Sequence, residues 1–422
     1  MERVVVTGLG VVAPIAVGGG AFASALRETR GAFSALHVDG VGHPLPVAPL
    51  DGFVFADALA PHRGRCPTLA TRAAAIGHRS ARTVQTALVA ALEAIEDAPL
   101  ASSAEALEGF GVVVAGQNMN QRLGFEQAAR FAAAPEHVSP AYAMHHLDTD
   151  HVGALSEMMG ARGEGMTIGG ASASGNVALV HAMRLLRAGY LDACLVVGAM
   201  TDLSPVELVA LHALGALAGE RFAARPADAC RPFDRDREGF VYGPSCACLV
   251  LESASRAARR DAPIWAELLG GSIVLDGRRT TEPSASGEAA AMRGALASAG
   301  VPAESVHYLN AHGTASVLGD PTELDAATDV FGDHLGRMWV NSTKGLVGHG
   351  LTSAGVVEAA ATLVQLRHGF VHGNRNLSNP LRDRVRFAPS ESVAAELAIA
   401  MSNSFGFGGF NSSIVFARGP GV

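Results

Sequence analysis

Short, almost wholly apolar runs alternate with helix-like segments along the entire chain. Residues 3–9 (RVVVTGL) and 111–116 (GVVVAG) are strand-like, and residues 79–97 between them repeat apolar side chains at helical spacing. Apolar strands separated by helices are typical of sheets that are covered on both faces. The pattern therefore predicts an α/β protein. Further predicted strands lie at residues 193–200, 246–253, 306–312, 338–343, 396–404 and 411–417.

The composition excludes several classes of protein. The 422 residues are 49% hydrophobic and 17% charged, which indicates a globular chain with a large core. A formal charge of -8 argues against a nucleic-acid-binding protein, which needs a basic face. The sequence has no run of 18 apolar residues and no signal-peptide pattern in its first residues. We therefore expect no membrane span and a cytoplasmic location, with the five cysteines unpaired.

Polarity along the chain indicates where it divides. Residues 275–288 are the most polar stretch and are expected to form a long loop, and charge also rises over residues 252–264. We therefore predict two α/β halves, residues 1–255 and residues 256–422.

The opening TGLGVVAP has two of the three glycines of a dinucleotide-binding turn. Pro14 follows them, and no acidic residue lies at a suitable distance downstream. We expect no nucleotide site there.

Residues 166–180 (MTIGGASASGNVALV) have the pattern of a strand end, a turn of small residues and an apolar helix. Ser172 lies at this junction, where α/β sheets bind ligands and where free backbone N–H groups can hold an anion. Two interpretations stand on these residues alone. Ser172 and Ser174 cap the helix, or Ser172 belongs to an active site and offers its backbone N–H to an oxyanion.

Three segments of the second half place reactive side chains close to strand ends. His312 ends the strand in YLNAHGT, and Lys344 and His349 follow the next strand in VNSTKGLVGH. Residues 402–413 (SNSFGFGGFNSS) are predicted as a Gly/Phe loop between two strands. A single histidine at a strand end is usually structural. Two histidines in equivalent settings, one of them near a lysine, indicate a catalytic site.

With these motifs, the sequence resembles the β-ketoacyl-carrier-protein synthases of the thiolase superfamily over essentially its whole length. The resemblance implies a thiolase fold, a five-layered αβαβα body of two similar halves, normally a homodimer. It also implies an acyl carrier protein as partner, which presents the substrate on its phosphopantetheine arm. No resident cofactor and no metal are expected.

The functional residues of that family map onto this chain one by one. Its catalytic pair of histidines and its lysine match His312, His349 and Lys344. The residues expected to orient them are Asp320, Glu323 and Thr314. The aromatic residues expected to form the pocket are Phe240 on the malonyl side, Phe405, and Phe407 as the mobile gate.

The chain departs from the family at two places. Ser172 stands where the family has its nucleophilic cysteine, and residues 243–247 (GPSCA) replace the family's Gly-Glu-Gly-Ala-Gly. A serine hydroxyl is not ionised near neutrality, so it cannot accept an acyl chain without a base. Decarboxylation needs only hydrogen-bond donors at the enolate oxygen and an apolar wall. The sequence therefore predicts that malonyl-carrier protein is converted to acetyl-carrier protein.

Free-standing family members with this exchange occur in polyketide gene clusters beside an HMG-CoA-synthase-like enzyme that installs β-methyl branches. GGASASGNVAL and VVGAMTDLSPVELVAL resemble that subgroup. The resemblance thus implies that the acetyl group supplied is the donor for polyketide β-branching.

Three alternatives stay open. One is a serine-dependent acyltransferase in which a histidine acts as the base. Another is a non-condensing partner subunit of a ketosynthase, against which the retained His312, Lys344 and His349 count. The third is a condensing enzyme whose cysteine was replaced by mutagenesis, against which the altered residues 243–247 count.

Two further clusters lie outside these motifs. Five arginines either meet an acidic carrier protein or lie on a solvated helix face, which is the more frequent case: Arg63, Arg65, Arg72, Arg79 and Arg82. Another cluster resembles a metal site but falls in a region predicted as loop, without supporting geometry: His145, His146, Asp148, Asp150 and His151.

Overall fold

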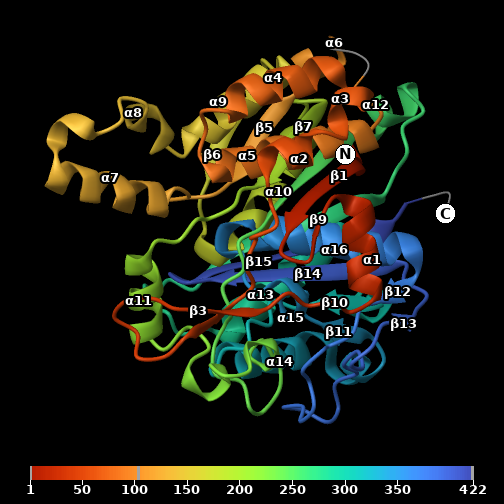
Figure 1. Ribbon diagram of the computed structural model, residues 1–422. Coiled ribbons are helices and arrows are strands. Elements are labelled where there is room, and N and C mark those ends of the chain that lie inside the picture. Colours follow the sequence, from red (N-terminus) through yellow and green to blue (C-terminus); the bar gives the residue numbers. More distant parts are fainter. Residues whose placement is uncertain (1, 102–104, 420–422) are drawn as a thin grey trace.

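The fold is built around one continuous sheet, and its two five-stranded parts, called the first and the second sheet below, share one strand order (Figure 1). The computed structural model describes residues 2–101 and 105–419. The first sheet has the order β6-β5-β7-β8-β1 and the second β11-β10-β14-β15-β9. The first contains β1 (Val4–Ala13), β5 (Gly111–Ala115), β6 (Gly165–Ile168), β7 (Ala193–Gly198) and β8 (Cys246–Ser253). The second contains β9 (Ala266–Leu275), β10 (Tyr308–Asn310), β11 (Trp339–Asn341), β14 (Ile399–Gly406) and β15 (Phe410–Arg418).

Both sheets also repeat one pattern of strand directions. In the first, β8 is antiparallel to β1 and β7, whereas β7, β5 and β6 are parallel. In the second, β15 is antiparallel to β9 and β14, whereas β14, β10 and β11 are parallel. The sheets join where Val5 and Val6 of β1 pair with Glu267 and Ala266 of β9. The division at residues 255 and 256 stays a prediction.

Helices form three layers around the two sheets (Figure 1). α5 and α9 lie on the outer face of the first sheet, and α13, flanked by α14, lies on the outer face of the second. α10 and α16 lie between the sheets and contact strands of both. The predicted five-layered αβαβα fold is therefore confirmed. These helices are α5 (Arg82–Asp97), α9 (Thr149–Met159), α10 (Ser174–Arg187), α13 (Ala285–Ala299), α14 (Gly319–Phe331) and α16 (Ala354–His368).

The remaining helices and short strands lie outside these five layers. The helices are α1 (Gly19–Arg27), α2 (Phe55–Leu59), α3 (His62–Arg65), α4 (Pro67–Gly77), α6 (Glu105–Glu108), α7 (Gln121–Ala133), α8 (Tyr142–His145), α11 (Pro205–Ala213), α12 (Ala254–Arg259) and α15 (Lys344–Val347). The short strands are β2 (Ala16–Val17), β3 (Ser34–Leu36), β4 (Leu45–Val47), β12 (Phe370–Val371) and β13 (Val393–Ala394). α7 and α8 project from the body beyond the edge of the first sheet (Figure 1).

Close contact between the two central helices determines where the reactive residues meet. A Cβ atom at Gly175 of α10 would lie 2.6 Å from the backbone nitrogen of Val356 of α16, and a Cβ atom at Gly355 would collide with the backbone of α10. Only glycine permits this crossing. The amino ends of the two helices therefore lie side by side. The segment before α10 carries Ser172, and the segment before α16 carries His349.

The glycines of the opening TGLG have a packing role. A Cβ atom at Gly8 would lie 2.2 Å from the carbonyl oxygen of Ala94, and one at Gly10 would lie 2.0 Å from that of Ala90. Both carbonyls belong to α5, so these glycines allow β1 to approach that helix closely.

The predicted Gly/Phe loop between two strands is present, and it is shorter than residues 402–413 because most of that segment continues the strands as a tight hairpin. β14 continues to Gly406 and β15 begins at Phe410, and these two residues pair across the hairpin. Only residues 407–409 form the turn, in which Gly408 and Gly409 have φ of 83° and 79°. Two successive left-handed glycines allow the antiparallel ladder to run up to the turn.

Within the part of the chain that the structure describes, no helix has the length and apolar character needed to cross a membrane.

Candidate active site

A cavity of about 510 Å³ brings together residues from both halves of the sequence. Ser172 comes from the first half, and His312 and His349 come from the second. Other predicted site residues that line it are Phe240, Phe405, Phe407 and Thr314. The three remaining predicted residues are buried behind this lining: Lys344, Asp320 and Glu323.

Ser172 lies in a short turn between β6 and α10. The preceding Ala171 has φ of 49°, a left-handed conformation that costs a non-glycine residue free energy and turns the chain sharply. The Ser172 hydroxyl lies 2.9 Å from Nε2 of His349, and that of Ser174 donates to the carbonyl oxygen of Ala171 at 2.7 Å. Neither side chain caps α10, because no side-chain cap is formed there. The capping interpretation was therefore wrong for both serines.

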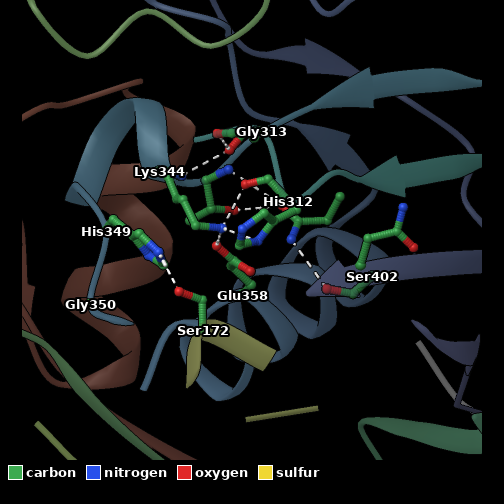
Figure 2. Close-up of polar contacts among 12 residues, drawn as sticks. Ser172, His312, Gly313, Lys344, His349, Gly350, Glu358 and Ser402 are labelled. Carbon is green, nitrogen blue, oxygen red and sulfur yellow. Dashed lines mark hydrogen bonds and ion pairs between the residues drawn. The ribbon is translucent and has the colours of Figure 1, made fainter. Parts of the chain in front are cut away.

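The hydrogen bonds of His349 assign its ring proton. The backbone N–H of Leu351 donates to Nδ1 of His349 at 3.3 Å, so Nδ1 is an acceptor. The proton of the neutral ring is therefore on Nε2, which donates toward Ser172 (Figure 2). The backbone of His349 is held in place as well, because its backbone N–H donates to the carbonyl oxygen of Val241 at 2.7 Å.

His312 has the same proton arrangement. The ammonium group of Lys344 lies 3.3 Å from Nδ1 of His312 and donates to the carbonyl oxygen of that residue at 2.6 Å (Figure 2). Because an ammonium group only donates, Nδ1 of His312 is an acceptor and Nε2 carries the proton. The rings of His312 and His349 meet edge to face, with centroids 5.6 Å apart. The cavity thus receives two Nε2–H donors.

Both histidine rings are held neutral. Burial lowers the pKa of His312 well below its usual value, and the positive charge of Lys344 lowers it further. Burial and the same ammonium group lower the pKa of His349 well below its usual value. Because both rings are neutral near pH 7, each has one acceptor nitrogen, Nδ1, and one donor nitrogen, Nε2.

Lys344 is the only lysine in the chain, and its acidic partner is Glu358 of α16. Both side chains are 1% exposed. Burial raises the pKa of Glu358 to about 7, and the Lys344 charge opposes that rise. The sequence analysis missed Glu358. Its signal was the single acidic residue in the mainly apolar helix that follows His349.

Glu323 contacts one of the catalytic histidines, as expected, whereas Asp320 contacts neither histidine ring in the described structure. Glu323 accepts from the backbone N–H groups of His312 and Gly313, each at 2.8 Å, so it orients the His312 backbone. Asp320 accepts from the backbone N–H of Phe233 at 2.6 Å. The expectation that these two acids orient Lys344 was wrong, because the short helix that begins at Lys344 aims its ammonium group at α16.

Aromatic rings wall the two histidines. The ring of Phe240 lies edge-on to His349, with centroids 5.1 Å apart, and that of Phe405 lies 5.7 Å from His312. Phe407, at the hairpin turn, is 44% exposed. Thr314 donates its hydroxyl to Ser316 at 3.0 Å and does not orient the histidines.

The altered segment at residues 243–247 supports the turn that leads into α16. The hydroxyl of Ser245 lies 3.2 Å from that of Ser353, and both are buried. A Cβ atom at Gly350 would lie 2.4 Å from the Ser245 oxygen, so this serine fills the space beside the glycine. Ser245 therefore packs against the backbone next to His349 and does not line the cavity.

The two clusters outside the motifs lie elsewhere. All five arginines of the basic stretch are exposed. The region at His145 is helical, since α8 ends there and α9 begins at Thr149, so the prediction of a loop was wrong. His145 pairs with Asp150 at 2.8 Å, and Asp148 accepts from the backbone N–H groups of residues 118 and 119.

Comparison with known proteins agrees with this architecture. Residues 1–257 match the model of the beta-ketoacyl synthase N-terminal domain, and residues 265–378 match that of the C-terminal domain. The chain is 37% identical to the polyketide biosynthesis malonyl-ACP decarboxylase PksF of Bacillus subtilis (strain 168), over 98% of this chain and 96% of that protein.

Two solved structures show the same fold. A beta-ketoacyl synthase from Burkholderia phymatum STM815 superimposes with a TM-score of 0.86 at 28% identity, covering 99% of this chain and 100% of that one. A type II polyketide ketosynthase in complex with its acyl-carrier protein gives a TM-score of 0.84 at 26% identity and covers 99% of each chain. The family models and the near full-length relative show that this chain belongs to the β-ketoacyl synthase family.

Proposed function

We propose that this protein decarboxylates a malonyl thioester on an acyl carrier protein and releases acetyl-carrier protein. One observation carries the proposal. Both histidines present an Nε2–H to the cavity, and one of them faces a serine hydroxyl where the family has a thiol. The site therefore keeps the donors that stabilise an enolate and lacks the thiolate that accepts an acyl chain.

The geometry supports each step of the decarboxylation. The thioester oxygen accepts from Nε2–H of His312 and of His349, so the negative charge that develops as CO2 leaves is stabilised. Each donor of this kind typically contributes about 10²–10³ in rate. The rings of Phe240 and Phe405 exclude water from the malonyl carboxylate, which favours its loss as neutral CO2.

A serine-dependent acyltransferase would also need a hydrogen bond between Ser172 and a histidine, and His349 forms one. A general base must accept the hydroxyl proton through an unprotonated nitrogen. Here Nδ1 of His349 already accepts from Leu351, which leaves the proton on Nε2. His349 is therefore a donor to the serine oxygen, and the decarboxylase is favoured.

The substrate would arrive on the phosphopantetheine arm of an acyl carrier protein, with no resident cofactor. The cavity mouth offers exposed apolar side chains on two segments, Leu214 after α11, and Val317 and Leu318 before α14. The likeness to PksF supports a role in polyketide biosynthesis. In that role the acetyl product would be the donor for β-branching.

We also propose a homodimer in the cytoplasm. β6 is the end strand of the first sheet and pairs on one side with β5. The adjacent arm of α7 and α8 exposes Phe125, Phe131 and Met144. A second copy would cover these apolar side chains and the strand edge. The five cysteines are free and buried, as is usual in a reducing compartment.

Mass spectrometry of the carrier protein tests the proposed function. Malonyl-carrier protein mixed with the enzyme is expected to lose the mass of CO2, while the enzyme mass stays unchanged. A malonyl group that persists would refute the decarboxylase. An acyl adduct on the peptide that contains Ser172 would establish the acyltransferase instead.

A further inference from the structure

Glu288 is a buried acid in the wall of the catalytic cavity. It lies in the first turn of α13, is 2% exposed and lines the same cavity as Ser172, His312 and His349. Its Oε2 atom has no hydrogen-bond partner among the described residues. Buried carboxyl oxygens are normally hydrogen-bonded, so this one requires an explanation.

The surroundings of Glu288 keep it protonated. Burial raises its pKa well above the usual value, and the nearby carboxylates of Glu323, Asp276 and Asp320 raise it further, in that order. A negative charge here would be buried without a compensating cation. Glu288 therefore holds a proton that it can release only to a strong acceptor.

The other acids that line the cavity are engaged or exposed. Glu207 forms a capping box with Ser204 at the start of α11, and Asp276 accepts from the side chain of Asn411 at 2.8 Å. Glu282 is exposed at the mouth. Among the described acids of this lining, Glu288 alone is both buried and without a partner for a carboxyl oxygen.

Contacts through one pair of strand residues connect the start of α13, where Glu288 lies, to His312. Asn411 pairs with Phe405 across the β14–β15 hairpin, so their side chains project from the same face of the sheet. Phe405 lies against His312, and Asn411 is so close to α13 that a Cβ atom at Gly287 would lie 2.7 Å from its Nδ2 atom. Glu288 follows Gly287 directly.

The proposed reaction requires a proton on carbon. Loss of CO2 from the malonyl carboxylate leaves an enolate, and a proton must reach C2 of that enolate to give the acetyl group. Both histidines are neutral, and in the proposed step each gives its single N–H to the thioester oxygen, that of His349 turning from the Ser172 hydroxyl. Lys344 donates to His312 and Glu358 behind the lining, away from the substrate carbon.

We propose that Glu288 is the proton donor to C2 of the enolate. As the thioester carbonyl re-forms, the electron pair of the enolate forms the new C–H bond and the Glu288 O–H bond breaks. The resulting carboxylate regains its proton from water that enters at the mouth after CO2 has left. This inference rests on the proposed function.

Glu288→Gln tests the inference, since it keeps the shape of the side chain and removes the acidic proton. The kcat for acetyl-carrier protein formation is expected to fall by about 10²–10⁴, the usual contribution of a general acid. The exposed Glu304→Gln is the control and is expected to keep wild-type kcat. A kcat for Glu288→Gln within about twofold of wild type would overturn the inference and leave the decarboxylase function standing.

A second readout separates proton donation from a structural role. In an equal mixture of H2O and D2O, the deuterium content of the acetyl methyl group reports the immediate donor. It is expected to differ between wild type and Glu288→Gln, because water replaces the carboxylic acid as donor. Glu288→Ala is expected to regain activity with added formic acid. A fallen kcat with unchanged deuterium content and no rescue would overturn the inference.

Discussion

The Ser172 hydroxyl accepts a 2.9 Å hydrogen bond from Nε2–H of His349, so the residue at the nucleophile position is paired with a donor and not with a base. A thiolate would be stabilised in that position, whereas a hydroxyl stays protonated. The exchange of the cysteine sulfur for the serine oxygen therefore separates acyl loading, which needs a thiolate, from decarboxylation, which does not.

Removal of the serine oxygen is expected to leave decarboxylation nearly intact. Ser172→Ala frees Nε2–H of His349 for the thioester oxygen, so kcat should stay within about threefold of wild type. His349→Ala or His312→Ala removes a donor and should lower kcat by about 10²–10³. Steady-state release of CO2 measures all three variants. A larger loss for Ser172→Ala than for His349→Ala would favour the acyltransferase.

Ser172→Cys is expected to restore acyl loading. The amino end of α10 and the two Nε2–H donors would stabilise a thiolate. The serine hydroxyl stays protonated at this position and provides no such anion. Incubation with acetyl-carrier protein should then add one acetyl mass to the enzyme within minutes. Wild-type protein serves as the unlabelled reference, and the absence of an adduct on the cysteine variant would show that more than the thiol has been lost.

The buried ion pair between Lys344 and Glu358 is expected to be essential to folding. Glu358→Gln leaves the Lys344 ammonium buried without a counter-charge, which should lower the free energy of unfolding by about 3–5 kcal/mol. Urea denaturation measures the loss, with the exposed Glu304→Gln as control. In the double variant Lys344→Met, Glu358→Leu, stability should be largely recovered. Failure of that recovery would contradict the charge argument.

Because Lys344 is the only lysine, a side-chain label reports on it alone. Protein grown with ¹⁵N-lysine should give a single side-chain ammonium signal in NMR spectra. The shift of this signal in His312→Ala is expected to change, since Nδ1 of His312 is one of its acceptors. An unchanged signal would place Lys344 away from His312 in solution.

The pH dependence of decarboxylation is expected to lack an inflection at the ordinary histidine pKa. Burial and Lys344 lower the pKa of His312 and of His349 well below 6.5, so both rings stay neutral as pH falls from 8 through 6.5. Protonation of the folded rings should therefore lower activity only further toward acid pH. The kcat profile between pH 5 and 9 checks this, and an inflection near 6.5 would contradict it.

The stability contribution of the same rings has a definite sign. Unfolded histidines bind protons below about 6.5, whereas the folded rings do so only at lower pH. The unfolded state therefore holds more protons in that interval, and these two groups make the protein less stable as pH falls below 6.5. His312→Asn, which cannot be protonated, should reduce the slope of unfolding free energy against pH in that interval.

The crossing of α10 and α16 is expected to tolerate no side chain. Gly175→Ala would drive a methyl group to within 2.6 Å of the Val356 nitrogen and should cost several kcal/mol or prevent folding. Gly153→Ala in α9, where nothing lies within 4 Å of the added carbon, should instead stabilise by about 0.4–1 kcal/mol. Thermal melting measures both variants: a lower Tm for Gly175→Ala reports the steric clash, and a higher Tm for Gly153→Ala reports the lower backbone entropy of the unfolded chain.

The sequence was most informative where a pattern is local or where a motif is complete. Alternating apolar runs predicted the principal strands, and the motifs around His312, Lys344 and His349 located three residues that the structure brings together. The sequence was least informative about partners. Glu358 stands 14 residues after Lys344, and spacing alone does not indicate that α16 turns this acid toward the ammonium group.

By itself, the sequence determined the family, the layered α/β architecture and the loss of the thiol at Ser172, because residue identity and hydrophobic period are written along the chain. The tertiary structure decided which nitrogen of each histidine carries the proton, which acid neutralises Lys344, and that Glu288 lines the cavity without a partner. Those features depend on the distances between groups that fold together from remote segments, and the chain acquires these distances only when its two central helices pack between the sheets.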